Sequence, residues 1–389
     1  MKNIYFILII FIFFLLNFSS CSDGGSSSNS GTLSLDLTDA ASDDYKAVYV
    51  TIKEVKVNKK DDEDSENGWK TVATPDKTYN LLELVNGVRE ELGITSLSPG
   101  AYSQMRMILG TEPDDEDNIL FQPHECANYI IGKDDEVHEL KVPSGEQTGI
   151  KIVCGFEINA NSTTELILDF DASRSVVKAG NSGKWLLKPV VKVSDEALNS
   201  VITGVIEESE GEGEKIEGAF VSVQTYDGEE EDPKDRVTVY TTTLSSEDDN
   251  DCGQYKLFVP SGDYNIVVYK EGYEISCARV SVEAGNEYTQ DFSLVDSETC
   301  TISGEVSVGD DPEDEDLYVT ISFRQLMTCG IEDDQMVEIK SVNVGNGSEY
   351  SINLPTDVSL VVASSYEEET QEFVDLTDYK NGQPLDIDM

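Results

Sequence analysis

Two histidines, His124 and His138, are the only residues in the sequence that could carry histidine-based acid–base catalysis. Both lie in a polar stretch, residues 122–139, whose pattern predicts a loop and a hairpin. A histidine in such a stretch is usually a solvated loop residue. We therefore predict no catalytic role for either one.

Ser144 is the one serine whose setting suggests a nucleophile. Its Pro-Ser-Gly tripeptide recurs at residues 260–262 between two predicted strands, which is typical of a hairpin turn. The sequence contains no phosphate-cradling glycine loop with a following Lys-Ser or Lys-Thr, no G-x-S-x-G elbow and no H-E-x-x-H pair. We predict that the protein is not an enzyme, with a hydrolase activity in the first domain as a remote alternative.

Asp169 and Asp171 flank Phe170, so on a strand both carboxylates would point to one face, as in a glycosidase pair or a cation site. A short helical turn is expected to begin near Ala172, and capping of that turn is the favoured interpretation. Other acidic loops offer oxygen ligands that suit calcium, but none has EF-hand spacing. We predict no cofactor and no metal centre, with weak calcium binding left open at residues 61–66, 114–117, 229–232, 248–251 and 310–316.

Besides Cys21, the chain has six cysteines, two in each of three segments, and no pair has CxxC spacing. The simplest expectation is one disulfide per segment, although other pairings and free buried thiols stay open. Such usage indicates an oxidising compartment, and with only two histidines it disfavours zinc. The expected pairs are Cys126–Cys154, Cys252–Cys277 and Cys300–Cys329.

The N-terminus has the form of a secretory signal. Lys2 precedes an apolar run, residues 4–16, that is shorter than the roughly 20 residues a spanning helix needs, so we expect residues 1–20 to be removed. Residues 18–21 read Phe-Ser-Ser-Cys, which resembles the lipobox of bacterial lipoproteins except that Phe18 replaces the usual Leu. An ordinary signal peptide with a chance cysteine is the alternative.

The lipobox resemblance implies that Cys21 is lipidated and anchors the chain to a membrane. Residues 21–31 contain no large apolar side chain after the cysteine and are expected to form a flexible tether. Ser22 is not the Asp that retains lipoproteins in the inner membrane of enteric bacteria, so the resemblance favours the outer membrane. Whether the protein faces the periplasm or the outside stays open.

Charge restricts the partners. The 389 residues include 77 acidic and 27 basic side chains, a net charge of −50. Such a field repels nucleic acid, so no nucleic-acid partner is expected. A solvated, soluble surface is the simplest explanation.

Short runs of alternating apolar and polar residues dominate from residue 32 onward and predict an all-β chain of tandem β-sandwiches. Two stretches are expected to be helical, residues 79–92 and a short turn at 171–177. The first segment, 32–195, resembles the bacterial lipoprotein family named domain of unknown function 4382, which implies a β-sandwich with one short helix but no activity. The resemblance is carried by residues 31–40, 50–52, 54–55, 79–84, 99–106, 143–145, 148–151, 169–172, 175–176 and 187–189.

Residues 199–296 resemble the carboxypeptidase regulatory-like module, a prealbumin-like or Ig-like sandwich that is generally non-catalytic. The resemblance is carried by residues 203–205, 216–223, 253–260, 262–268, 270–273, 280–285 and 291–294. Residues 299–389 are expected to be a degenerate second copy, because 302–304, 350–355 and 358–362 align with 202–204, 255–260 and 264–268. The sequence thus suggests separate beads on a tether.

The favoured hypothesis is a non-enzymatic, membrane-anchored envelope lipoprotein that displays binding or adhesion modules. Carbohydrate binding is what the module resemblance implies first, yet the only tryptophans, Trp69 and Trp185, lie in the first domain, where burial is the common fate. The alternative is a structural spacer or assembly component, in which the two C-terminal modules hold the first domain away from the bilayer. A glycan or another envelope protein is the expected partner.

Overall fold

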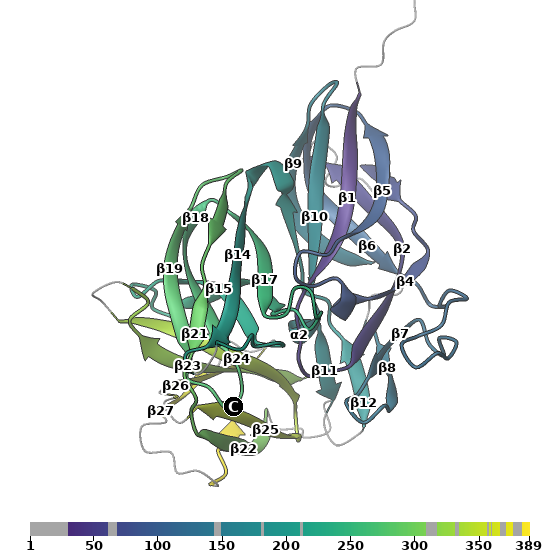
Figure 1. The fold of residues 1–389 in the computed structure, drawn as a ribbon. Coiled ribbons are helices and arrows are strands. Elements are labelled where there is room, and N and C mark those ends of the chain that lie inside the picture. The colour runs from purple at the N-terminus through teal and green to yellow at the C-terminus, as the bar shows by residue number, and fades with distance from the viewer. Residues whose placement is uncertain are drawn as a thin grey trace, which may run out of the picture.

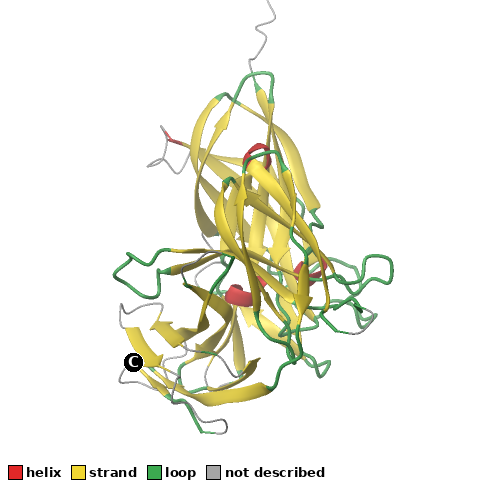
Figure 2. Cartoon of the chain, turned by 60° about the vertical axis from the view of Figure 1, so that its left-hand side comes forward, coloured by secondary structure: helices red, strands yellow, loops and turns green. Residues whose placement is uncertain are grey.

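The chain folds into three packed β-sandwiches, here called domains 1, 2 and 3 (Figure 1). The computed structural model describes residues 30–60, 68–143, 149–179, 183–210, 213–308, 317–330, 334–355, 358, 360–365, 371–375 and 383–389. Nearly all regular structure is strand, as Figure 2 shows, which confirms the predicted all-β class. Among the described residues no helix is long and apolar enough to cross a membrane.

Domain 1 is a sandwich of two sheets. The first has the order β13-β10-β1-β5. Its strands are β1 (Gly31–Ala40), β5 (Glu90–Leu97), β10 (Thr163–Asp171) and β13 (Val191–Asp195). The second has the order β8-β7-β2-β6-β9, with β3 and β4 also paired to β2. Its strands are β2 (Ala47–Lys59), β3 (Trp69–Ala73), β4 (Lys77–Asn80), β6 (Gly100–Leu109), β7 (Asn128–Ile131), β8 (Val137–Lys141) and β9 (Ile150–Ile158).

The apolar residues of the alternating sequence pattern form the core of domain 1. On β1 the side chains of Leu33, Leu35 and Leu37 are fully buried, while the residues between them are half-buried. The strand runs parallel to β10 and antiparallel to β5. Its first residue lies beside the turn at Asn159, and its last lies at the contact with domain 2, where the amide of Ala41 donates to the carbonyl of Thr242. At about 3.3 Å per residue, β1 spans roughly 30 Å between these two ends.

The helix expected over residues 79–92 is wrong. The chain instead forms β4, a single 3-10 turn at Leu81–Glu83, and then β5. Asn86 and Gly87 both have positive φ, 57° and 82°, which ends any helix there. The predicted turn at 171–177 is confirmed in a shorter form as α2, Ala172–Ser175. A further hairpin, β11 (Val176–Ala179) and β12 (Lys184–Leu187), follows it.

Domain 2 begins at β14 and has two sheets. In the first, β14 pairs with β17, β20 and β21; the second has the order β16-β15-β18-β19. The strands are β14 (Asn199–Glu208), β15 (Phe220–Tyr226), β16 (Val237–Leu244), β17 (Gln254–Pro260), β18 (Gly262–Tyr269), β19 (Ser276–Val282), β20 (Glu287–Thr289) and β21 (Phe292–Leu294). One short 3-10 turn, Glu196–Leu198, links it to domain 1.

Domain 3 repeats this strand order. In it β22 pairs with β25 and β28, and the other sheet runs β24-β23-β26-β27. The strands are β22 (Thr299–Ser307), β23 (Tyr318–Met327), β24 (Gln335–Gly345), β25 (Glu349–Pro355), β26 (Leu360–Ser365), β27 (Gln371–Asp375) and β28 (Ile387–Asp388). Descent of the third segment from the second stays a prediction.

The two sandwiches also share details of construction. Gly204 and Gly304 each lie so close to a crossing strand that an added Cβ would meet a carbonyl oxygen at 1.9 Å. In each domain a tyrosine hydroxyl donates to that same carbonyl at 2.6 Å, Tyr255 in domain 2 and Tyr350 in domain 3. In both sandwiches the same carbonyl thus lies against a glycine of the first strand and accepts from a tyrosine of the strand paired with it.

The sequence suggested separate beads, but the three domains pack against one another. The sheet of domain 3 continues into that of domain 1 through a parallel contact between β24 and β11, giving one sheet of 13 strands. Domain 2 packs against both of its neighbours (Figure 1). Where the three domains meet, a buried ion pair, hydrogen bonds to the backbone and a disulfide join them.

Candidate functional site: the three-domain junction

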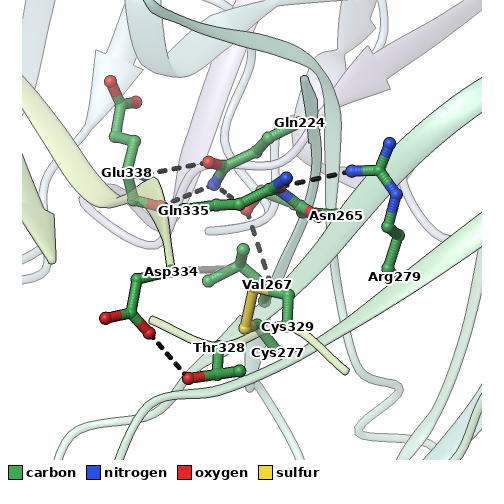
Figure 3. The surroundings of a disulfide bond; sticks show 11 residues. Gln224, Asn265, Val267, Cys277, Arg279, Thr328, Cys329, Asp334, Gln335 and Glu338 are labelled. Carbon is green, nitrogen blue, oxygen red and sulfur yellow. Dashed lines mark hydrogen bonds between the residues drawn. A yellow bond between two sulfur atoms is a disulfide. The ribbon is translucent and has the colours of Figure 1, made fainter. Parts of the chain in front are cut away.

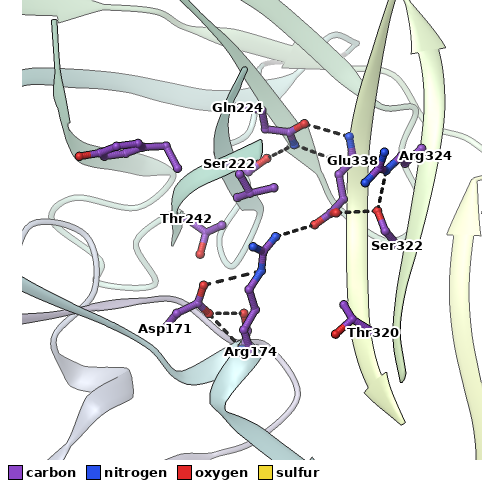
Figure 4. A network of polar contacts seen from close by, with 12 residues as sticks. Asp171, Arg174, Ser222, Gln224, Thr242, Thr320, Ser322, Arg324 and Glu338 are labelled. Carbon is purple, nitrogen blue, oxygen red and sulfur yellow. Dashed lines mark hydrogen bonds and ion pairs between the residues drawn. The ribbon is translucent and has the colours of Figure 1, made fainter. Parts of the chain in front are cut away.

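The junction is built on the short helix α2, which follows β10 of the first sheet of domain 1. Asp171 caps this helix by accepting hydrogen bonds from the amide of Arg174 at 3.0 Å and the hydroxyl of Ser173 at 2.7 Å. The predicted capping role of Asp171 is thus confirmed. The cap fixes the backbone from which the Arg174 side chain extends toward domain 3 (Figure 4).

Glu338, a buried residue of β24, receives that side chain. Arg174 donates to one carboxylate oxygen at 3.1 Å, and Ser322 of β23 donates to the other at 2.5 Å. Burial acts to raise the pKa of Glu338, but Arg174 and the neighbouring Arg324 outweigh it, so its pKa is lowered and the carboxylate is charged at neutral pH. Because the buried carboxylate is held by Arg174 of domain 1 and Arg324 of domain 3, it fixes the position of one domain relative to the other.

Domain 2 joins the same cluster through Gln224 of β15. Its amide nitrogen donates to the backbone carbonyl of Glu338 at 2.6 Å, and its amide oxygen accepts from the backbone N–H of Glu338 at 2.9 Å (Figure 4). Arg324, also buried, donates to the carbonyls of Pro233 and Lys234 in domain 2 at 2.5 and 3.0 Å. Domain 2 therefore recognises domain 3 by backbone-directed bonds that require a fixed register.

A second ionic contact joins domains 1 and 3. Lys340 lies between Asp43 and Asp44 of domain 1, at 2.5 and 3.1 Å. Burial acts to lower its pKa, but the two carboxylates outweigh it and the pKa is raised. Asn343 adds a hydrogen bond to the carbonyl of Arg174 at 2.9 Å. These contacts place β24 against domain 1 along much of its length.

A disulfide between Cys277 of β19 and Cys329, which follows β23, joins domains 2 and 3 (Figure 3). The amide of Arg279 donates to the carbonyl of Cys329 at 2.8 Å, and Gln335 accepts hydrogen bonds from Asn265 at 2.7 Å and Arg279 at 3.2 Å. The bond lies within a continuous polar seam.

This pairing corrects the prediction of one disulfide per segment. The expected partners of Cys277 and Cys329, Cys252 and Cys300, are free, as are Cys126 and Cys154. The reason is packing between domains, which brings the β19 edge to the turn after β23. A structural disulfide is typical of oxidising compartments, so the chain is extracytoplasmic.

Domain 1 and domain 2 also meet around a small cavity of about 30 Å³, room for one or two waters. Lys192 of β13 enters this interface and donates to the carbonyls of Val239 and Tyr240. Asp169, paired opposite Lys192, has one buried carboxylate oxygen without a hydrogen-bond partner. Burial, and next the charge of Asp171, raise the pKa of Asp169 to about 6.

His124 is buried rather than solvated, which corrects the expectation for that residue, whereas His138 is half-buried. The imidazole of His124 is 3% exposed, hydrogen-bonds the hydroxyl of Tyr129 at 2.6 Å and packs against the ring of Tyr49. His138 stacks on Trp185, with ring centroids 5.3 Å apart. Because Tyr129 is fully buried, its pair with His124 is a structural contact.

Both tryptophans are partly buried. Trp185 packs against the core of domain 1, and Trp69 carries the guanidinium of Arg106 over its ring at 4.1 Å. Within the described residues, no group of three or more His, Cys, Asp or Glu side chains is placed to hold a metal ion. Cys21, Ser144 and the acidic loops 61–66 and 310–316 lie outside the described residues.

Residues 30–189 match the family described as "Domain of unknown function (DUF4382)". Domain 1 is a DUF4382 domain. The resemblance predicted for residues 32–195 is thus confirmed, although the match covers less than half of the chain. No curated protein matches the chain.

Solved structures with distant similarity include two pilins. The Bacillus anthracis TIE protein is 12% identical, covering 93% of this chain and 50% of its own, with a TM-score of 0.21. The shaft pilin SpaA from Lactobacillus rhamnosus GG is 11% identical over 49% of this chain and 96% of the pilin, TM-score 0.20. A streptococcal ancillary pilin is 10% identical over 92% and 98%, TM-score 0.20. This chain spans half the length of the first, and at such TM-scores none of them informs its function.

The junction was not visible in the sequence. Arg174 and Glu338 are 164 residues apart, Gln224 and Glu338 are 114 apart, and the three form no motif. Two signals pointed toward them, the capped turn at 171–177 and an apolar-polar alternation in β23 that places Ser322 and Arg324 on one face. The sequence offered nothing that paired these segments.

Proposed function

We propose that this chain is a non-enzymatic, lipid-anchored envelope protein that displays its three sandwiches as one rigid unit on a flexible tether. The observation that carries the proposal is the junction itself. Buried ion pairs, backbone-directed amide bonds and a disulfide join all three domains. Breaking such contacts leaves uncompensated buried charge, so the domains are expected to move together.

The position of the tether sets the order of the domains. Residue 30 leaves the sandwich at the turn after β9, where the amide of Asn161 donates to the carbonyl of Ser30, and the junction lies at the far end of β1. A lipid on Cys21 would place domain 1 nearest the bilayer and project domains 2 and 3 beyond it. This order is opposite to the spacer hypothesis in which the C-terminal modules hold domain 1 away from the membrane.

Carbohydrate binding receives little support from the aromatic residues on which it depended. Arg106 stacks over the ring of Trp69, and His138 stacks on that of Trp185. We therefore favour display of a protein-contacting surface over glycan capture. The carboxypeptidase regulatory-like character of domains 2 and 3 belongs to this proposal too, as a scaffold role without catalysis.

The anchor is tested by comparing the full chain with its Cys21→Ser variant in a bacterial host that processes lipoproteins. The wild-type chain should incorporate labelled palmitate and partition into detergent, while the variant should do neither. A wild-type chain that incorporates no lipid and is recovered as a soluble protein would contradict the anchor.

A further inference from the structure

Domain 2 covers an ionisable side chain on the outer face of the first sheet of domain 1. Thr38 of β1, Asp169 of β10 and Lys192 of β13 lie in register across three neighbouring strands. The apolar residues that alternate with them pack into the core of domain 1, so this row faces away from it. The three residues line the small cavity at the interface, together with residues 240–243 and 256–258 of domain 2. Domain 2 therefore stands between Asp169 and the solvent.

The carboxylate of Asp169 is incompletely paired in this closed arrangement. Its Oδ1 atom is buried and accepts no hydrogen bond from the described residues, and the same is true of Oδ1 of Asn86, which lines the same cavity. The ammonium of Lys192 donates instead to the carbonyls of Val239 and Tyr240. Two acceptor oxygens cannot bond each other, whereas a protonated Asp169 offers a donor toward the cavity. The closed contact therefore suits the protonated carboxyl better than the carboxylate.

The charges around Asp169 oppose one another. Burial, and next the charge of Asp171, raise its pKa, while Lys192 and a hydrogen bond from Thr241 lower it, and the balance is a pKa of about 6. Burial is the largest of these effects, and it depends on domain 2 remaining in place. The titratable groups that face Asp169 come from each strand around the cavity: Asp39 of β1, Asp171 of β10, Lys192 of β13, Tyr240 of β16 and Lys256 of β17.

Opening of the contact would return Asp169 to water, where its pKa would lie near the ordinary value of 3.8. The closed contact therefore binds the proton more tightly than the open one, and acid favours closure. This contribution is complete below about pH 4 and is lost as pH rises through 6. With these two pKa values, the equilibrium favours the closed contact about tenfold more at pH 5.0 than at pH 7.5.

We propose that Asp169 acts as a proton-dependent latch between domains 1 and 2, which closes more tightly when the surroundings become mildly acidic. The junction with domain 3 and the Cys277–Cys329 bond hold domain 2 at its other contacts, so the opening is local. The latch does not depend on the lipid anchor, and a failure of either one leaves the other standing.

Two backbone amides of domain 1 report whether the latch is closed. Ala41 donates to the carbonyl of Thr242 at 3.5 Å, and Asn86 donates to the hydroxyl oxygen of Thr243 at 2.8 Å. Both bonds cross the interface beside the cavity, because Thr242 and Thr243 are among the residues that line it. These amides therefore exchange when domain 2 lifts, without unfolding of either domain.

Hydrogen exchange of the full chain at pH 7.5 and 5.0, resolved to single amides by fragmentation mass spectrometry, tests the proposal. Each rate is compared with that of an unprotected peptide at the same pH. Protection of Ala41 and Asn86 should rise about tenfold from pH 7.5 to 5.0, and low concentrations of urea should not change it, as expected for local opening. The amide of Leu35, inside the central strand β1, should be better protected at both pH values, because it exchanges only on unfolding.

Two variants separate the latch from other effects of pH. Asp169→Asn is neutral at both pH values, so the protection of the two reporter amides should be high and equal. Glu157→Gln, which changes an exposed acid of β9, is the control and should keep the tenfold rise of the wild-type chain.

A titration of the wild-type chain does not depend on how the variants fold. The carboxyl carbon of Asp169, followed by nuclear magnetic resonance, should titrate near pH 6. A carboxyl that titrates near its ordinary pKa of about 4 would overturn the proposal. So would wild-type protection that stays constant with pH, or a rise of equal size in Asp169→Asn.

Discussion

Replacing Glu338 with glutamine should loosen the junction without changing its shape. The substitution removes a buried negative charge that faces Arg174 and Arg324. Removing one partner of a buried ion pair costs about 3–5 kcal/mol. The lower end applies, because the Arg174 side chain is 29% exposed and stays near Asp171, and Arg324 keeps two backbone carbonyls. We expect a loss of about 3 kcal/mol in the free energy of unfolding.

Urea unfolding followed by far-UV circular dichroism measures this loss as a shift of the midpoint at constant slope. Glu349→Gln is the matched control, since Glu349 is an exposed glutamate of β25 in the same domain. It should change the free energy of unfolding by less than about 0.5 kcal/mol. If Glu338→Gln loses no more than this control, the buried charge does not hold the domains together, and the reasoning about the junction is wrong.

Three further outcomes follow from the contacts described. Replacing both Cys277 and Cys329 with alanine should lower the free energy of unfolding by about 4 kcal/mol, because the bond closes a separation of 52 residues, and peptide mapping without reductant should recover only that pair. Because the pKa of Asp169 is raised to about 6, the folded chain binds this proton more tightly than the unfolded chain, so the group's contribution to stability grows as pH falls from 7 through 6 and is complete near pH 4. Thermal melts should show Asp169→Asn more stable than wild type at pH 7.5, with the gap closing by pH 4.5; a constant gap would contradict this. Gly204→Ala should destabilise domain 2 by about 3 kcal/mol or more, since its Cβ would lie 1.9 Å from the carbonyl of Gln290, whereas Gly155→Ala, with open space around it, should be near neutral in the same melts.

Local patterns in the sequence predicted much of the fold. Alternation in β1 and the repeated strands of domains 2 and 3 predicted sandwiches, because one buried face imposes a period of two. Asp171 was interpretable as a cap because an acidic residue before a short turn has a local hydrogen-bonding role. These features depend only on residues close in sequence.

The predictions that failed depended on contacts between residues that are distant in the sequence. The pattern of apolar residues at 79–92 fits a helix, yet Asn86 and Gly87 take left-handed conformations where that loop meets domain 2 through Thr243. Cys277 pairs with Cys329 because two domains pack together, which spacing within a domain cannot reveal. His124 is buried because Tyr49 and Tyr129 on neighbouring strands enclose it. In each case tertiary packing decided the outcome over local preference.

A distance measurement between domains 1 and 3 tests rigidity most directly. Spin labels on non-natural side chains at Lys70 of β3 and Ser351 of β25, both exposed, report that distance by double electron–electron resonance without using the native cysteines. We predict one narrow distribution that broadens in the Glu338→Gln variant when the disulfide is reduced. A broad or multiple distribution in the wild-type chain would contradict a rigid three-domain unit.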